Sequence, residues 1–262
     1  MVPDFPELTM DFRVRYAEVG PDALARLSAV ADWFQEAAGV NASALGFGNE
    51  ALFSQGLTWI LTRMIFYVRS LPEVGQSVQV RTWPAQRDHL AHRGYELLDG
   101  GNEPLIRATG AWAIMDLATR RIVPMPAALA EAYPCRTIPY VPFLGSVTPR
   151  LRKVADECTV QARKDDLDMN GHVNNARYLG WLLEPVSEPS GALAALEVTF
   201  RAECLPGETL LSRCSAALPA GTAESGEPFL QREHAIVRTN EQGASVDVCR
   251  AVSRWRPAAQ QN

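Results

Sequence analysis

The sequence predicts an α+β protein made of a duplicated unit, in which a strongly curved antiparallel sheet packs around one helix. The order strand, helix, then four strands occurs twice along the 262 residues. Trp33 and Trp181 occupy like places in the two predicted helices, 181 − 33 = 148 residues apart. Each strand-rich region also ends near a tryptophan, Trp112 or Trp255. A helix with one apolar face buries that face against a sheet, and two such units can cover each other's sheet edges.

The first unit is predicted to begin with a strand over 12–16, where polar and apolar residues alternate. Apolar residues spaced by three and four predict a helix over 23–39, which Gly39 ends. A loop at 46–48 follows this helix. The predicted buried side of the helix carries Leu24, Leu27, Val30, Ala31, Phe34 and Ala38. Turn residues then separate four predicted strands, over 58–69, 77–85, 92–99 and 105–117.

A proline-rich stretch separates the two units and predicts an extended linker without regular structure. Its prolines are Pro124, Pro126, Pro134, Pro139, Pro142 and Pro149. We therefore predict a first domain at 1–126, a linker at 127–155 and a second domain at 156–262. In the second domain we expect a strand over 158–163, a helix, and strands over 196–201, 208–218, 229–239 and 244–255. The tail after Pro257 is predicted to fray.

The composition narrows the class of protein. With 47% hydrophobic residues the chain can build a large core, yet no run approaches the ~18 apolar residues of a membrane span. The first residues lack a basic region before an apolar one, so we expect no secretory signal, and they are too acidic for a transit peptide. A net charge of −5 argues against nucleic-acid binding. Five cysteines without metal-binding spacing fit a reduced, cytoplasmic protein.

Polar groups that can carry chemistry concentrate in residues 165–184, just before an apolar run with helical spacing. Asp168, Asn170 and His172 precede this predicted helix. Pro185 lies near the end of the helix, and Pro189 and Gly191 stop it. The N-terminus of a helix favours negative charge, so these side chains could activate a water and hold an oxyanion. The same residue types also cap helices and form turns, and the pattern alone leaves both roles open.

Residues 166–184 read DLDMNGHVNNARYLGWLLE and closely resemble the hotdog-fold thioesterases, in which an acidic loop and Gly-His-Val-Asn-Asn open the central helix. More narrowly, the string resembles the signature of the fatty acyl-ACP thioesterases. Residues 200–205 are similar to an aromatic-Arg-Arg-Glu-Cys-Gly stretch of the plant enzymes, from which they depart at Ala202 (in place of the second Arg) and Leu205 (in place of the Gly). Further stretches of the first half also resemble the family, at 33–38, 46–48, 57–64, 107–112 and 119–122.

The resemblance implies a double-hotdog fold and the hydrolysis of fatty acyl-ACP to free fatty acid, which ends chain elongation in fatty acid biosynthesis. It places Asp168, Asn170, His172 and Glu203 in the catalytic set, with Cys204 as a possible auxiliary residue. Two mechanisms stay open: Glu203 or Asp168 polarises a water while His172 completes a proton path, or Cys204 attacks with His172 as its base. The alternative functions are a hotdog acyl-CoA thioesterase and a non-catalytic module that binds acyl thioesters. Neither mechanism needs a metal or cofactor, because a thioester carbonyl is already electrophilic.

A shift of 148 residues aligns Gly20, Asp22 and Leu24 of the first unit with the polar set of the second, so the first unit lacks matching chemistry. An acyl chain needs a long apolar slot, and we expect the first unit to hold this tail between its helix and its sheet. The predicted lining is Leu27, Val30, Ala31, Phe34, Trp59, Leu61 and Trp112, and the competing interpretation is that these residues simply pack a core. Acyl carrier protein is acidic, so its docking surface should be basic. The candidates are Arg120, Arg121, Arg150, Arg152, Lys153 and Arg177, although each could be an ordinary solvated charge. We expect a monomer or a homodimer.

Overall fold

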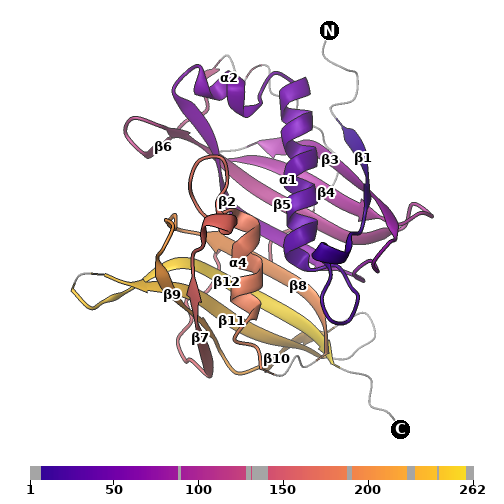
Figure 1. Ribbon diagram of the computed structural model, residues 1–262, viewed down its shortest axis with the longest axis vertical. Coiled ribbons are helices and arrows are strands. Elements are labelled where there is room, and N and C mark those ends of the chain that lie inside the picture. The colour runs from indigo at the N-terminus through magenta and orange to yellow at the C-terminus, as the bar shows by residue number, and fades with distance from the viewer. Residues whose placement is uncertain are drawn as a thin grey trace. The chain divides into compact units, whose positions relative to one another are not determined.

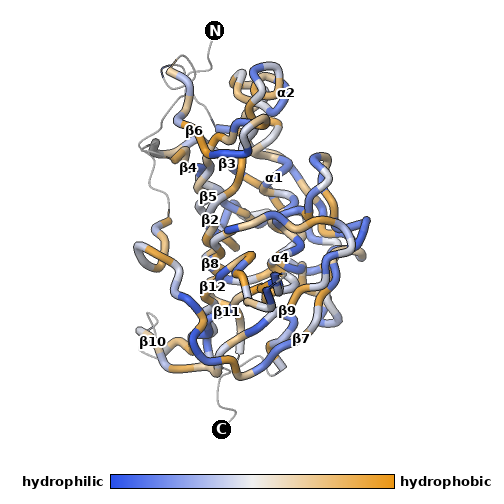
Figure 2. The backbone as a smooth tube through the Cα atoms, turned by 90° about the vertical axis from the view of Figure 1, so that its left-hand side faces the viewer, coloured by the Kyte–Doolittle hydropathy of each residue, from blue (hydrophilic) through white to orange (hydrophobic). Residues whose placement is uncertain are grey.

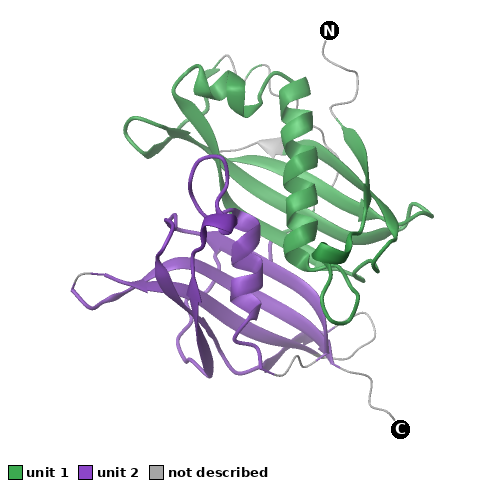
Figure 3. Cartoon of the chain, in the orientation of Figure 1, with its two compact units in different colours: residues 1–142 green, residues 143–262 purple. Residues whose placement is uncertain are grey.

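The computed structural model describes residues 7–87, 90–127, 131, 141–187, 191–222, 228–240 and 242–257. The chain divides into two compact units, residues 1–142 and 143–262 (Figure 3). The division falls inside the stretch 127–155 that was predicted to be a linker. The predictions for the first six residues, most of 128–140, Pro189 and the tail after Pro257 lie outside the described residues.

Unit 1 is an antiparallel sheet with helix α1 lying across one face (Figure 1). Its strand order is β1–β3–β4–β5–β2, and the short β6 pairs with β5. The strands are β1 (Leu8–Arg13), β2 (Leu57–Val68), β3 (Ser77–Arg87), β4 (Ala91–Leu98), β5 (Pro104–Asp116) and β6 (Arg121–Val123). The helical elements are the 3-10 turn η1 (Tyr16–Glu18), α1 (Leu27–Ala44) and α2 (Asn49–Phe53).

Unit 2 repeats this arrangement. Its strand order, in the same direction as that given for unit 1, is β7–β9–β11–β12–β8, and the short β10 pairs with β11. The strands are β7 (Asp156–Gln161), β8 (Gly191–Phe200), β9 (Thr209–Cys214), β10 (Leu218–Thr222), β11 (Pro228–Thr239) and β12 (Ser245–Pro257). The helical elements are the 3-10 turn η2 (Lys164–Asp166) and α4 (Asn175–Leu183). In both units one helix therefore covers one antiparallel sheet.

Each helix buries its apolar side against its own sheet, and hydrophobic residues recur along the strands beneath it (Figure 2). In unit 1 the Phe34 ring lies 5.0 Å from the ring of Tyr95 on β4 and 6.1 Å from that of Phe66 on β2, measured between centroids. All three side chains are almost fully buried. Burying one such side chain stabilises a fold by roughly 1.5–3 kcal/mol, so this stack anchors α1 on the sheet.

The predicted helix over 23–39 was placed too early. It begins at Leu27 because residues 20–25 form a turn, in which the Gly20 N–H donates to the Leu24 carbonyl at 2.9 Å. It continues through Gly39, which is exposed and has open space where a Cβ would lie, and ends at Ala44. Gly46 follows with φ +80°, the left-handed conformation that commonly ends helices. The first strand likewise lies at Leu8–Arg13 rather than 12–16.

Among the described residues, five short elements were not predicted: α2, β6, β10 and the 3-10 turns η1 and η2. The expectation that prolines exclude regular structure from the linker is wrong at Ala127 and Glu131, which are helical. Pro126 precedes them, and proline is tolerated at the start of a helix because its missing N–H would be unpaired there anyway. In unit 2 the helix ends earlier than predicted, at Leu183, because Pro185 cannot donate to the helical ladder. Within the described residues, no helix combines the length and apolar character needed to cross a bilayer.

Candidate active site at the start of helix α4

The loop that leads into α4 is closed by its own backbone. Asp168 donates its N–H to the His172 carbonyl at 2.8 Å, and an isolated β-bridge joins Leu167 to Val173. Gly171 lies inside this turn with φ +77°, a conformation that a side chain disfavours. Asn174 then caps the helix, because its Oδ1 accepts the Ala176 N–H at 2.9 Å.

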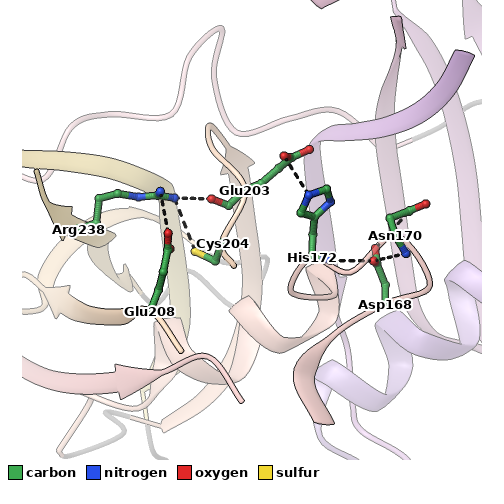
Figure 4. A network of polar contacts seen from close by, with 7 residues as sticks. All are labelled: Asp168, Asn170, His172, Glu203, Cys204, Glu208 and Arg238. Atoms are coloured by element: carbon green, nitrogen blue, oxygen red, sulfur yellow. Dashed lines mark hydrogen bonds and ion pairs between the residues drawn. The ribbon is translucent and has the colours of Figure 1, made fainter. Parts of the chain in front are cut away.

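The Asp168 carboxylate organises this loop from within. Its Oδ1 accepts the Asn170 N–H at 2.8 Å and the His172 N–H at 3.3 Å, and its Oδ2 lies 3.5 Å from the Asn170 amide nitrogen. The three polar residues of the motif are therefore held together in one turn (Figure 4). Asp168 therefore stabilises the turn, one of the two roles that the sequence pattern left open. Its Oδ2 makes only the long contact with the Asn170 amide.

A second loop, after the end of β8 at Phe200, brings a carboxylate to the imidazole. The Glu203 Oε2 lies 3.4 Å from the His172 Nε2 (Figure 4). Nearby, the Val173 N–H donates to the Cys204 carbonyl at 3.1 Å, so a backbone hydrogen bond ties the two loops together beside the pair. The His172 side chain is 22% exposed and that of Glu203 is 40% exposed, which leaves the pair accessible to water.

Cys204 lies next to Glu203 but is fully buried. Burial raises the pKa of its thiol, although a hydrogen bond with the Tyr178 hydroxyl and the nearby Arg238 charge act in the opposite direction. Burial also raises the pKa of the Tyr178 hydroxyl. Thiolates rather than thiols are nucleophiles, so this environment suits a packing residue better than an attacking group.

Two residues that the sequence analysis did not single out complete the network, Arg238 on β11 and Glu208 beside β9. The Arg238 guanidinium donates to the Glu203 backbone carbonyl through Nη2 and to the Glu208 Oε1 through Nη1, the latter at 3.1 Å. A strand-by-strand alignment of the two halves could have found Arg238, because the first half has no arginine at the corresponding position.

The first turn of α4 offers fewer free N–H groups than expected. The N–H groups of Val173, Asn174 and Arg177 donate to the backbone carbonyls of Cys204, Asp166 and Asn174. The Ala176 N–H is bound by the cap. Among the described contacts, the Asn175 N–H is the group of this turn without a protein acceptor.

Unit 1 builds the same turn without the reactive groups. Its Gly20 N–H donates to the Leu24 carbonyl at 2.9 Å, and a bridge joins Val19 to Ala25. Each of these residues lies 148 positions before its counterpart in unit 2. Ala23 stands in the place of Gly171 and adopts the same left-handed conformation, with φ 62°. The predicted duplication is thus confirmed at the level of single hydrogen bonds, and Gly20 and Leu24 carry nothing that could replace Asp168 and His172.

The predicted acyl-chain residues fall into two groups within unit 1. Leu27, Val30, Ala31 and Phe34 are buried on α1, and Leu61 is buried on β2. Trp59 and Trp112 are only half-buried and pack with Leu45 and Met125 against Phe47 and Ala91. Of the predicted docking residues, Arg120 and Arg121 are exposed in unit 1. Arg150, Arg152 and Lys153 are exposed in unit 2, where Arg177 is half-buried.

A sheet wrapped on one helix, present twice, with a carboxylate–imidazole pair at the helix start of the second copy, defines a double-hotdog protein. Residues 7–133 match the acyl-ACP thioesterase N-terminal domain, and residues 151–257 match the C-terminal domain of the same family. The chain therefore belongs to the acyl-ACP thioesterase family.

Two plant relatives agree with this assignment. The chain is 30% identical to a chloroplastic palmitoyl-acyl carrier protein thioesterase of Gossypium hirsutum, over 98% of this chain and 65% of the relative. It is 28% identical to the corresponding protein of Cuphea hookeriana, over 94% of this chain and 61% of the relative. The chain thus spans roughly three fifths of the length of these curated relatives.

Solved structures share the fold along almost the whole chain. The 12:0-ACP thioesterase from Umbellularia californica superimposes with a TM-score of 0.76 at 26% identity, covering 97% of this chain and 95% of that one. An acyl-ACP thioesterase from Bacteroides thetaiotaomicron superimposes with a TM-score of 0.78 at 23% identity, covering 96% of this chain and 98% of that one.

Proposed function

We propose that this protein hydrolyses fatty acyl thioesters of acyl carrier protein, releasing a free fatty acid and the carrier's pantetheine thiol. The observation that carries the proposal is the His172–Glu203 pair, 3.4 Å apart and open to water, beside the Asp168–Asn170 turn. The family, and the acyl-ACP substrates for which the plant relatives are named, support the choice of substrate.

In the proposed mechanism Glu203 polarises a water molecule and takes its proton as the water oxygen bonds to the thioester carbonyl carbon. The tetrahedral intermediate then collapses, the C–S bond breaks, and the proton passes through His172 to the departing thiolate. Asp168 holds the N–H groups of Asn170 and His172, which keeps the imidazole facing Glu203. Preorganised groups of this kind lower the barrier because they need not rearrange during the reaction.

The developing negative charge on the carbonyl oxygen needs hydrogen-bond donors. We assign this role to the Asn170 side-chain amide and the Asn175 N–H, because the other N–H groups of the first turn of α4 are engaged within the protein. The positive end of the helix dipole adds a favourable contribution at the same place.

Cys204 is expected to form no acyl-enzyme. Its thiol is fully buried and its pKa is raised by burial, which keeps it protonated at neutral pH. Intact-protein mass spectrometry of samples quenched during turnover of acyl-ACP should therefore show no acyl adduct, and Cys204→Ser should retain most activity. An adduct whose mass follows the acyl chain, and that disappears in Cys204→Ser, would replace direct water attack by the nucleophilic mechanism.

The function itself is tested by supplying the purified chain with matched acyl-ACP and acyl-CoA substrates of the same chain lengths. We expect thiol release from both types of thioester, with a higher kcat/KM for acyl-ACP. A preference for acyl-CoA would assign the protein to the acyl-CoA branch of hotdog thioesterases. Binding of acyl-ACP without any thiol release would leave a non-catalytic acyl-binding module and overturn the proposal.

Docking of the carrier protein is expected to depend on basic residues of the segment that precedes β7. Arg150 and Arg152 are both exposed there. Reversing both charges, Arg150→Glu with Arg152→Glu, should raise KM for acyl-ACP, more strongly at low salt, because an acidic partner would then be repelled. Turnover of acyl-CoA, measured in parallel, should stay unchanged. Equal effects on both substrates, or no effect on either, would exclude this pair from the docking surface.

We further propose that the protein works in the cytoplasm. Cys158, Cys204, Cys214 and Cys249 are all free thiols. Free thiols persist in reducing compartments, whereas cysteines of proteins in oxidising compartments usually pair.

A further inference from the structure

The loop that carries Glu203 is held at its start by a β-bulge. The register between β11 and β12 shifts after Ile236, which pairs with Cys249, whereas Val237 pairs with Asp247. The residue left over, Val248, turns its carbonyl to the chain after β8. There it accepts the N–H groups of Arg201 at 2.9 Å and Ala202 at 3.1 Å. This bulge fixes the backbone just before Glu203.

Unit 1 contains the same bulge and holds the same loop. The register between β4 and β5 shifts between Leu97 and Leu98, and the Leu105 carbonyl accepts the N–H groups of Arg69 at 2.9 Å and Ser70 at 3.3 Å. The duplicated fold therefore shapes this loop through its backbone alone, in a unit whose turn carries Gly20 and Leu24 in place of Asp168 and His172.

One interaction of the loop in unit 2 has no counterpart in unit 1. Nη2 of Arg238 donates to the Glu203 carbonyl and lies 4.0 Å from the Cys204 sulfur, while Nη1 is held by Glu208 at 3.1 Å (Figure 4). The Arg238 guanidinium therefore holds the backbone of Glu203 by a hydrogen bond, and the side chain of Glu203 faces His172.

The corresponding residues of unit 1 follow from the strand register. Tyr95 pairs with Thr82 as His234 pairs with Cys214, so the residue four positions on from Tyr95, Asp99, corresponds to Arg238. In the same way the Val14 N–H donates to the Gln76 carbonyl as the Ala162 N–H donates to that of Glu208. Asp99 of unit 1 thus corresponds to Arg238 of unit 2, and Gln76 corresponds to Glu208. The ion pair exists only in the unit that has the reactive set.

The Arg238–Glu208 pair is also a poor source of stability. Within the described part of the chain, Arg238 Nε and Glu208 Oε2 are buried without any hydrogen-bond partner, which costs free energy. The two side chains are 30% and 27% exposed, and partly exposed ion pairs contribute little to stability. Unit 1 forms the loop without such a pair. A role in folding therefore does not account for it.

We propose that Arg238, held by Glu208, is a positioning residue that fixes the Glu203 carboxylate opposite His172. It acts through the Glu203 backbone and does not touch the reacting atoms. This inference rests on the proposed function, because it assigns Arg238 a part in the turnover that Glu203 supports.

The test is a double-mutant cycle between Arg238→Met and Glu203→Gln, with kcat and KM measured on acyl-ACP. Arg238→Met alone should lower kcat by about 10- to 100-fold and leave KM nearly unchanged, because misplacing a catalytic group has effects of this size. In the Glu203→Gln background the same substitution should have less than about a 3-fold further effect, since the group that it positions is already disabled. Arg238→Lys should restore part of kcat, because it keeps one donor for the Glu203 carbonyl.

Arg213→Met is the matched control. Arg213 also lies in the sheet of unit 2, pairs with a glutamate (Glu157, at 2.9 Å), and has a 24% exposed side chain. Both methionine variants should shift Tm similarly, whereas only Arg238→Met should lower kcat. Additive effects of Arg238→Met and Glu203→Gln, or a loss of activity that follows the loss of stability in both methionine variants, would overturn the positioning role.

The cycle also separates this inference from the proposed function. If Glu203→Gln itself leaves turnover intact in a folded protein, the proposed active site is wrong. If Glu203→Gln abolishes turnover but Arg238→Met leaves kcat unchanged, the active site stands and only the positioning role of Arg238 is excluded.

Discussion

Replacing Glu203 by glutamine is expected to lower kcat for acyl-ACP by ~10²-fold or more, the usual cost of losing a general base. Glutamine has the same shape and the side chain is 40% exposed, so the fold should not change. His172→Ala should have a similar effect, because it removes the imidazole 3.4 Å from that carboxylate. Asp168→Asn should also reduce kcat by ~10²-fold or more, because it removes the carboxylate charge from the site, while its amide oxygen can still accept the N–H groups of Asn170 and His172 and keep the turn.

The measurement is steady-state kinetics on acyl-ACP together with circular dichroism and Tm for each variant. Glu157→Gln is a suitable control, because Glu157 is an exposed carboxylate of the same unit that pairs with Arg213. It should retain normal turnover. Near-normal kcat in all three site variants while they remain folded would mean that the reaction takes place elsewhere. A loss confined to Asp168→Asn would make Asp168, rather than Glu203, the base.

Enlarging Ala31 to phenylalanine is expected to reduce kcat/KM for long acyl chains by roughly 10-fold or more while short chains are still hydrolysed. Ala31 is buried on the face of α1 that covers the sheet of unit 1, close in sequence to Phe34. If the acyl tail lies between this helix and the sheet, a larger side chain shortens the space and excludes long chains first. Products from a mixture of acyl-ACP chain lengths, resolved by gas chromatography, measure the change.

The competing interpretation is that Ala31 packs in a filled core of unit 1 and lines no acyl-chain slot. Phe34 already stacks between Phe66 and Tyr95, so part of this region is filled. In a filled core Ala31→Phe should cost roughly 1–3 kcal/mol through overpacking and impair all chain lengths alike. Val40→Phe adds the same ring on the exposed side of α1, where Val40 is 42% exposed, and should change neither stability nor product profile. An unchanged chain-length preference with reduced Tm in Ala31→Phe would place the acyl tail outside this part of unit 1.

The amino-acid pattern alone predicted the duplicated α+β architecture and located the candidate site residues. Hydrophobic periodicity depends on neighbours close in the chain, so most strands were predicted within a few residues. The spacing of 148 residues between Trp33 and Trp181 also predicted which residues of the turns correspond, such as Gly20 and Asp168. The ends of the helices were predicted less accurately. The sequence predicts that α1 ends at Gly39, but the helix continues through this residue, which is exposed and has open space around it.

How these residues contact one another follows from the folded chain and not from the sequence pattern. Asp168 and His172 are four positions apart, but the approach of Glu203 to His172 depends on a hydrogen bond between two loops, from Val173 to Cys204. The burial of Cys204 depends on the sheet and helix around it, which no local pattern encodes. Arg238 lies 35 residues beyond Glu203 on another strand. Its contact with the Glu203 loop is set by strand order, register and one bulge, and these arise only when distant segments of the chain pair.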